Sequence, residues 1–549
     1  MLKIIPLGGL GEIGLNMMVI EYDDVMFIID AGLMFPEDYM LGVDIVIPAM
    51  DYLRENRDKV QAVILTHAHE DHIGALPYLL KELRLPVYGT SFTLGIVRNK
   101  LVEFDLNKYV DLNLVKPGET LSIEPFEIEF IRVSHSTVDG VGLAIRTPEG
   151  VVVHTGDFRI SHNADKDRNT DISTFAKFGE QGVLALMSDS TNVEVKGYTM
   201  SEQEVARNLK KRIDVAQGRV IVALFASNVF RIQQVIDIAI QNNRKVIFNG
   251  RSMEQIISVA TELGHIKCPP NTFLDVKQIG KYKDNEIAII TTGSQGEPMS
   301  ALARMASGIH KHIKIKKGDN VILSSKYIPG NEKAIAGIIN KLYRRGADVV
   351  YSKIAQIHTS GHAHQEELKL MINLIKPKYF IPIHGEYRHL VVHARLAEKM
   401  GMPRENVFVA EDGKVITFDR DGCRMDGKVQ TGRILVDGKG IGDVGRSVLK
   451  ERRELSEGGL VVVTMILDEE TGVVLYGPEL ISKGFVFDAA TGYLVDDAQC
   501  VILEIVEEID LNTEDRLDVL RKKMQRALKQ YFAFAINRRP LIVPVIIEV

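Results

Sequence analysis

Cysteine is scarce in this sequence. Its 549 residues include three cysteines, Cys268, Cys423 and Cys500, and they lie far apart. Widely separated thiols form neither a disulfide framework nor a thiolate zinc site. Any metal site in this chain must therefore be built from histidine and carboxylate side chains.

Long apolar runs and an excess of positive charge are also missing. No apolar run is long enough to cross a bilayer, and residues 1–6 lack the charged-then-apolar order of a signal peptide. We therefore expect a soluble, cytoplasmic protein without a membrane partner. The formal net charge of -6 gives no basic footprint for nucleic acid, so composition alone does not predict an RNA partner.

The length indicates several domains, because 549 residues exceed what one hydrophobic core usually supports. Residues 1–198 alternate short apolar runs with turns, as in a mixed α/β domain. Residues 199–364 read as strand-then-helix units, which predicts an α/β domain inserted before the second part of the first domain at 365–437. A glycine-rich linker is expected at 438–450, followed by a small α+β domain at 451–549.

Histidine and aspartate residues follow the ends of apolar, strand-like runs. His67 comes directly after residues 61–66, and the later runs lead in the same way to a set of similar residues: His135, Asp157, Asp189 and His384. Functional sites commonly form at strand ends, where a rigid sheet positions side chains on loops. We therefore expect these side chains to meet in one site.

The motif His67-x-His69-x-Asp71-His72 places four ligand-type residues within six positions, between a predicted strand and an apolar helix. A single imidazole is more often a core or surface residue, but four such residues together are hard to explain by packing. Zinc binds imidazole nitrogen and carboxylate oxygen, and a hydrolytic site leaves one position for water. The motif therefore predicts a metal site.

With His135, Asp157 and His384 the chain has seven candidate ligands, more than one catalytic zinc can use. We expect two divalent ions, zinc in the first place with manganese as the alternative, bridged by one carboxylate and a hydroxide. Such a pair lowers the pKa of bound water and clamps the attacking and leaving oxygens of an in-line displacement. That chemistry suits phosphodiester hydrolysis.

A dinucleotide site is the competing interpretation at the N-terminus. Gly9-x-Gly11-x-x-Gly14 follows an apparent strand, and Asp30 ends another at roughly the distance of a ribose-binding acid. The fingerprint requires a helix to open within the glycine run, whereas residues 16–20 read as another strand. The glycines therefore indicate a tight turn near the metal site and not a dinucleotide site.

The ligand pattern resembles the metallo-β-lactamase superfamily, whose signature is His-x-His-x-Asp-His followed by a separate His and an Asp. Three downstream motifs resemble those of its β-CASP branch, which acts on nucleic acids: Ser-Asp-Ser-Thr at 188–191, Ser-Gly-His-Ala at 360–363 and Pro-Ile-His-Gly-Glu at 382–386. The length, the glycine-rich opening, Gly-Arg-Ser-Met at 250–253 and the C-terminal domain are similar to the bacterial ribonuclease J family.

This resemblance implies an αββα sandwich with two metals at its edge, an inserted β-CASP α/β domain and a small C-terminal α+β domain. It also implies how the metals are held. The first ion would be bound by His67, His69 and His135. The second would be bound by Asp71, His72 and His384, with Asp157 bridging the two.

The resemblance also assigns residues around the metals. Asp30 and Asp189 would orient ligand histidines. Asp71, Asp157 and His362 would be catalytic, and His362 is our hypothesis for the general acid that protonates the departing ribose oxygen. A pocket for a 5′ phosphate would use hydroxyls, amides and backbone N–H groups, with candidates Ser227, Asn228, Ser360, Gly361 and His362. For Ser227 and Asn228, an N-cap of the helix beginning at Val229 is the alternative.

The function implied by the resemblance is hydrolysis of single-stranded RNA, both internally and 5′-to-3′ from a 5′ monophosphate, in rRNA processing and mRNA decay. The family also implies a homodimer or homotetramer and partners in an RNA-degradation complex. Three alternatives remain: a DNA-processing β-CASP nuclease, a non-catalytic RNA-binding subunit of a degradation complex, and a thioester or lactam hydrolase. The last has no obvious use for an inserted domain.

Overall fold

The computed structural model describes residues 1–161, 168–297, 299–325, 331–352, 354–438, 440–485 and 493–549. The predicted linker includes Lys439, which lies outside the described residues. The chain divides into two compact units: the first comprises Met1–Met34 and Ile47–Arg433, and the second comprises Phe35–Val46 and Ile434–Val549. Among the described helices, none has both the length and the apolar character needed to span a membrane.

Two sheets form the framework of the first unit. The larger sheet has the strand order β22 (Gly422–Lys428), β21 (Lys414–Asp419), β1 (Leu2–Gly8), β3 (Met17–Tyr22), β4 (Val25–Ile29), β6 (Val60–Ile64), β7 (Val87–Gly89) and β8 (Leu112–Leu114). The second sheet has the order β19 (Tyr379–Ile383), β13 (Ala185–Asp189), β12 (Gly150–His154), β11 (Val141–Thr147), β10 (Phe126–Arg132) and β9 (Thr120–Ile123).

A continuous apolar core lies between these sheets. Ile20 and Phe27 of the larger sheet belong to the same buried cluster as Phe126 and Leu143 of the second sheet, and the rings of Phe27 and Phe126 meet edge to face at 5.1 Å. In β10 the side chains of Phe126 and Ile128 are buried while that of Glu127 is exposed, which is the alternation expected of a strand with one face on a core.

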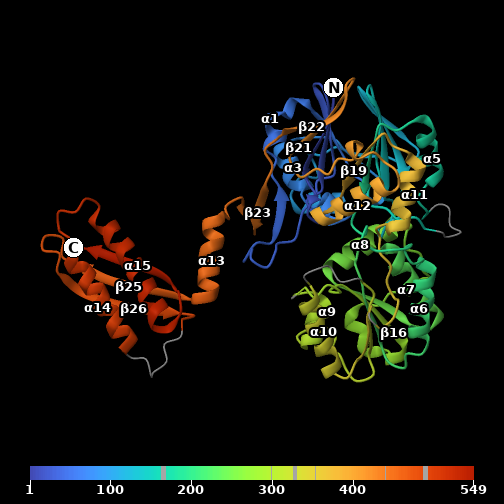
Figure 1. Cartoon of the computed structure of the whole chain (residues 1–549). Coiled ribbons are helices and arrows are strands. Elements are labelled where there is room, and N and C mark those ends of the chain that lie inside the picture. Colours follow the sequence, from blue (N-terminus) through green and yellow to red (C-terminus); the bar gives the residue numbers. More distant parts are fainter. Residues whose placement is uncertain (162–167, 298, 326–330, 353, 439, 486–492) are drawn as a thin grey trace. The chain divides into compact units, whose positions relative to one another are not determined.

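Helices cover the outer faces of both sheets (Figure 1). Phe178 of α5 (Ile172–Gln181), Met371 of α11 (Gln365–Ile375) and Leu396 of α12 (Tyr387–Lys399) pack on the far face of the second sheet. Helix α4 (Ser91–Glu103) contacts β7 and β8 of the larger sheet. The predicted αββα sandwich is therefore confirmed.

The segment between β13 and β19 contains a parallel sheet of its own, with the order β15 (Lys245–Asn249), β16 (Ile287–Thr291), β14 (Val220–Ala223), β17 (Asn320–Leu323) and β18 (Asp348–Val350). All residues of β14 and β16 are buried, as in parallel sheets that are covered on both faces. The flanking helices include α6 (Glu202–Asp214), α7 (Val229–Gln241), α8 (Arg251–Glu262), α9 (Ala301–Ser307) and α10 (Glu332–Arg344). The predicted inserted α/β domain is confirmed.

The second unit is an α+β structure. Its sheet has the order β26 (Val474–Lys483), β25 (Leu460–Leu467) and β27 (Leu541–Glu548). Alternate residues of β25 pack against α14 (Tyr493–Glu508) and α15 (Arg516–Ile536), where Leu528 and Phe532 are fully buried. Helix α13 (Arg446–Gly458) begins within the range predicted as a linker. The expected α+β class is confirmed.

Phe532 offers a test of this second core. Its ring is fully buried and lies 5.0 Å from the ring of Phe485, whereas Phe534 in the same helix is 94% exposed. We expect Phe532→Ala to lower the stability of the second unit by roughly 3–5 kcal/mol, because it leaves a cavity. Hydrogen exchange of the α14 and α15 amides should accelerate strongly in this variant and remain unchanged in Phe534→Ala. Equal protection in both variants would contradict the packing.

Candidate metal centre

Loops that follow separate strands converge on one point at the edge of the sandwich. His67 and His69 follow β6, His135 follows β10, Asp157 follows β12, and His384 follows β19. Since β12, β13 and β19 run parallel as neighbours, their carboxyl ends lie at the same edge of the sheet. The structure therefore brings together the side chains that the strand ends predicted.

Three histidines and one aspartate form a first group of potential ligands. His69 Nδ1 lies 3.0 Å from His67 Nε2 and 3.1 Å from His135 Nε2. Asp157 Oδ2 lies 3.7 Å from His67 Nε2 and 3.8 Å from His135 Nε2. Four donor atoms thus surround one small volume.

A second group shares the same aspartate. Asp71 Oδ2 lies 3.6 Å from His72 Nε2 and 3.3 Å from His384 Nε2. Asp157 Oδ2 lies 3.3 Å from His72 Nε2 and 3.7 Å from His384 Nε2. Asp157 is the only member common to both groups, so its carboxylate stands between them.

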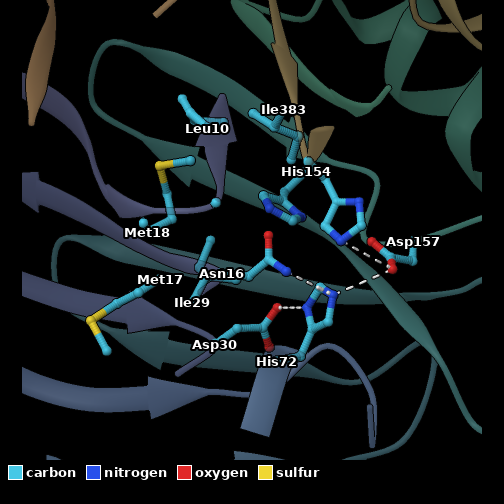
Figure 2. A pocket seen from close by; sticks show the side chains of 13 residues that line it. Leu10, Asn16, Met17, Met18, Ile29, Asp30, His72, His154, Asp157 and Ile383 are labelled. Carbon is cyan, nitrogen blue, oxygen red and sulfur yellow. Dashed lines mark hydrogen bonds and ion pairs between the residues drawn. The ribbon is translucent and has the colours of Figure 1, made fainter. Parts of the chain in front are cut away.

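The outer nitrogens of these histidines are engaged in hydrogen bonds. His72 Nδ1 donates to Asp30 Oδ2 at 2.7 Å, and Figure 2 shows Asp30 on one side of the His72 ring with Asp157 on the other. His135 Nδ1 donates to the carbonyl oxygen of Gly361 at 2.9 Å. His384 Nδ1 lies 2.6 Å from Thr191 Oγ1. Such bonds select the tautomer whose inner nitrogen carries a lone pair.

The donor set fits a divalent cation. Burial and the neighbouring histidines lower the pKa values of His67 and His135 well below the usual range, which keeps these rings neutral. Burial alone would raise the pKa of Asp157, but His384 and His72 outweigh it and lower the pKa, so the carboxylate is ionised. The neutral imidazoles of the first group turn lone pairs toward one another and cannot satisfy one another, whereas a cation accepts all of them. In the second group the neighbouring carboxylates outweigh burial and raise the pKa values of His72 and His384, so these rings take up protons when no cation is bound.

Several polar residues of this centre were not identified from the sequence. Thr66 Oγ1 lies 3.0 Å from His67 Nδ1 and donates to Asp30 Oδ2 at 2.8 Å. Asn16 Nδ2 lies 3.2 Å from His72 Nε2. Thr66 lies directly before His67 in the chain, and Thr191 belongs to the motif at 188–191 that contains Asp189; these positions are the signal that could have identified them.

Asp189 and the segment 360–362 lie beside both groups. Asp189 Oδ2 is 2.8 Å from His362 Nδ1, and Asp189 Oδ1 is 3.5 Å from His384 Nδ1. The His362 ring stacks on the His384 ring with a centroid distance of 5.3 Å. Ser360 Oγ accepts from Asn192 Nδ2 at 2.6 Å and from the His362 backbone N–H at 3.2 Å. His362 is thus held at the edge of the cluster.

Ser227 and Asn228, the two residues of the inserted domain that were predicted to line the phosphate pocket, have different surroundings. Ser227 Oγ lies 3.0 Å from His69 Nε2, so it contacts the histidine cluster directly. Asn228 is buried, and its Oδ1 accepts from the Arg231 backbone N–H at 3.0 Å. Asn228 therefore has the helix-capping role that was the alternative.

A small cavity lies on the inner side of the cluster. It has a volume of about 20 Å³, and its walls include Asn16, Asp30, His72 and Asp157 (Figure 2). This volume holds about one water molecule.

Comparisons with known proteins cover nearly the whole chain. Residues 10–190 match the metallo-beta-lactamase superfamily, 217–342 the ribonuclease J beta-CASP domain, 347–410 the Zn-dependent metallo-hydrolase RNA specificity domain, and 447–549 the ribonuclease J C-terminal domain. Ribonuclease J2 of Bacillus subtilis is 43% identical over 547 residues, with 100% of this chain and 98% of the relative covered. Ribonuclease J of Synechocystis is 41% identical over 555 residues, with coverages of 98% and 86%.

One solved structure shows a similar fold. A crystal structure of a protein of unknown function from Enterococcus faecalis superposes with a TM-score of 0.54 and 17% sequence identity. The match covers 76% of this chain and 99% of that protein. At this identity the likeness concerns the fold alone.

Gly32 allows the metal centre to be tested without touching a ligand. A Cβ atom at Gly32 would lie 1.6 Å from the carbonyl oxygen of Asp71, so Gly32→Ala must displace the backbone that carries Asp71 and His72. We expect zinc affinity to fall roughly 10- to 100-fold, as when ligand orientation is disturbed. The control is Gly337→Ala in α10, where a Cβ would meet open space. Chelator competition measures both, and equal affinities would contradict the prediction.

Proposed function

This chain belongs to the ribonuclease J family of metallo-β-lactamase/β-CASP nucleases, and on that premise we propose that it hydrolyses single-stranded RNA both internally and 5′-to-3′ from a 5′ monophosphate. The observation that carries the proposal is that Asp157 is shared by the two donor groups of the predicted ligands and by a third group that contains His362. Phosphodiester hydrolysis uses this arrangement because charge develops on both the attacking and the leaving oxygen.

Two divalent ions are proposed for the two donor groups, with zinc as the expected metal and manganese as the alternative. The first would be held by His67, His69 and His135, and the second by Asp71, His72 and His384. Asp157 would contact both. When bound, the ions supply Lewis acidity toward a phosphoryl oxygen and lower the pKa of a water molecule.

His362 is proposed as the general acid. Its Nδ1 is committed to Asp189 at 2.8 Å, which fixes the orientation of the ring and assigns Nε2 to proton transfer. In this role Nε2 gives a proton to the ribose oxygen that leaves the scissile phosphate. Asp189 acts as the partner that holds the ring, as Asp30 does for His72.

Phosphate groups of the substrate are proposed to contact Ser227, Ser360, Gly361 and His362, since hydroxyls and backbone N–H groups suit phosphate oxygens. Asn228 remains a candidate through its side-chain N–H2 group, because its Oδ1 is used by the helix cap. A 5′ monophosphate would be distinguished from an internal phosphate by its extra charge and its smaller bulk.

The wider role is proposed from the family. It comprises rRNA processing and mRNA decay in the cytoplasm by a homodimer or homotetramer, with partners in an RNA-degradation complex. The domain ranges 1–198, 199–364, 365–437, 438–450 and 451–549 are retained as the proposed division of the sequence.

End-labelled RNAs with a 5′ monophosphate or a 5′ triphosphate test the reaction. With the metal-loaded protein and a label on the 5′-terminal nucleotide, we expect the labelled nucleotide to be released as a mononucleotide only from the monophosphate RNA, while labelled internal fragments arise from both RNAs. Product lengths on a gel give the answer. Release of the labelled 5′-terminal nucleotide as a mononucleotide from both RNAs would contradict the proposed 5′-phosphate pocket.

A DNA strand of matched sequence separates the competing functions. Preference for DNA would favour the DNA-processing β-CASP nuclease over the proposed ribonuclease. A protein that retains two metals yet cleaves neither strand would favour the non-catalytic RNA-binding subunit.

His362→Ala tests the proposed acid. We expect cleavage to fall about 100- to 10,000-fold, which is the usual contribution of general acid catalysis, with the metal content unchanged. His312→Ala, which lies outside the cluster, is the control and should cleave at the wild-type rate. Rates come from single-turnover assays and metal content from elemental analysis. Loss of a metal would instead make His362 a ligand.

A further inference from the structure

A charged cluster unrelated to the metal ligands is buried inside the first unit. Glu202 in the first turn of α6 lies between two arginines, with Oε1 2.9 Å from Arg159 Nη2 and Oε2 2.6 Å from Arg231 Nη2. The side chains of Arg159, Glu202 and Arg231 are only 6%, 3% and 0% exposed. We call these three residues the Glu202 triad.

The carboxylate of the triad is ionised. Burial alone would raise the pKa of Glu202, but the guanidinium groups of Arg231 and Arg159 outweigh it and lower the pKa to about 2. Removing charges from water offsets most of their mutual attraction, so a buried ion cluster is weak evidence for stability. The effect of the triad is to fix the relative positions of its three side chains, because guanidinium and carboxylate groups form directional hydrogen bonds.

Both arginines also bind the segment that leads to His362. Arg159 Nη1 donates to the carbonyl oxygen of Ser360 at 3.2 Å. Arg231 Nη1 donates to the carbonyl oxygen of Ile357 at 3.2 Å and to Ser324 Oγ at 2.9 Å. Ser324 Oγ in turn donates to Ile357 O at 2.6 Å. Hydrogen bonds therefore hold the segment 357–360 at both of its ends. This segment comes immediately before Gly361 and His362.

The triad also reaches the other side of the histidine cluster. Arg231 belongs to the first turn of α7, and its backbone N–H is capped by Asn228. Ser227, which precedes this cap, contacts His69. One carboxylate thus links the helix end that carries Ser227 to the segment that carries His362.

Crowding around Gly361 leaves this segment little freedom. A Cβ atom at Gly361 would lie 2.6 Å from His135 Cε1, and the Gly361 carbonyl oxygen accepts from His135 Nδ1 at 2.9 Å. A shift of the segment 357–360 would therefore also displace His135 and His362, because there is no free space around Gly361 to accommodate it.

We infer that Glu202 is a positioning residue: through Arg159 and Arg231 it fixes the segment 357–362 against the first turn of α7, and so sets the placement of His362 relative to Ser227. Glu202 itself does not touch the ligands. The inference rests on the proposed function, since it concerns the placement of the proposed acid.

A second buried ion pair in the inserted domain provides a matched control. Arg219 Nε and Nη2 lie 2.8 and 2.6 Å from the carboxylate oxygens of Asp319, and both side chains are buried. Arg219 also donates to a backbone carbonyl oxygen, that of Lys314. Like Arg231, Arg219 binds its carboxylate through Nε and Nη2 in a buried environment, but this pair does not bind the segment 357–362.

The test compares Glu202→Gln with Asp319→Asn in the full-length, metal-loaded protein. We expect both variants to unfold at lower temperature, because Glu202→Gln leaves two buried arginines and Asp319→Asn leaves one without a charged partner. Only Glu202→Gln should lower kcat on single-stranded RNA, by about 100-fold with unchanged metal content, since small misplacements of catalytic groups are that costly. Assays are run below both unfolding transitions. A kcat for Glu202→Gln equal to that of Asp319→Asn would overturn the inference.

A double variant identifies the group through which Glu202 acts. In the His362→Ala background, Glu202→Gln should cause a clearly smaller loss of the residual rate than in the wild type, because one residue that it positions is already gone while Ser227 and Ser360 remain. An undiminished additional loss would overturn the inference. If His362→Ala cleaves like the wild type, the proposed acid fails and this inference fails with it; if His362→Ala is impaired and Glu202→Gln is fully active, the inference alone fails.

Milder variants keep the test available if Glu202→Gln does not fold. Arg159→Lys can keep one charged contact to Glu202 but loses the fork that also reaches the Ser360 carbonyl oxygen. Ser324→Ala removes one support of the Ile357 carbonyl oxygen. We expect each to lower kcat with intact metal content, and wild-type kcat in both would overturn the inference.

Discussion

The carboxylate of Asp157 is the constraint on which the rest of the structure depends. It is buried at the end of β12, and its Oδ2 lies within 4 Å of ring nitrogens from His67, His72, His135 and His384. A buried anion is costly unless positive charge compensates it. Imidazoles can compensate it by taking up protons, or a metal can do so while the rings stay neutral. The low pKa values of His67 and His135 favour compensation by a metal in the first donor group.

Holding donors from distant parts of the chain around one oxygen requires a rigid support. The apolar core between the two sheets supplies it, because strands buried on that core cannot slide without moving their side chains to the other face. Two site residues, Asp30 and His384, adopt left-handed backbone conformations with φ of 61° and 53°. Such conformations cost roughly 1–3 kcal/mol and persist where surrounding contacts over-determine them. Here the contacts are the hydrogen bonds to Thr66 and Thr191.

The ligand positions were predictable from the sequence because they depend on local order: an apolar strand, then a ligand at its end. The alternation of short apolar runs with helical stretches indicated the inserted α/β domain, whereas the αββα class was implied by the resemblance to the metallo-β-lactamase superfamily. Neither of them revealed the Glu202 triad. Arg159 and the Ser360 carbonyl oxygen that it binds are 201 positions apart. A single glutamate at the start of a helix is equally well explained as a capping residue or as a charge that interacts favourably with the helix dipole. A contact between distant segments produces no periodic pattern in the sequence of either segment, so it can be identified only from the folded structure.

The acidic composition, with a formal net charge of -6, is compatible with an RNA substrate once the site is considered locally. Asp30, Asp71, Asp157 and Asp189 place four carboxylates around the histidines, and without compensating positive charge these would repel an approaching phosphate. On the proposed occupancy, two divalent ions contribute four positive charges and cancel them. The ions would therefore be needed for the substrate to approach as well as for the chemistry. In that case the bound metals would contribute to the affinity for RNA at the point of cleavage, and a net charge calculated from composition does not include that contribution.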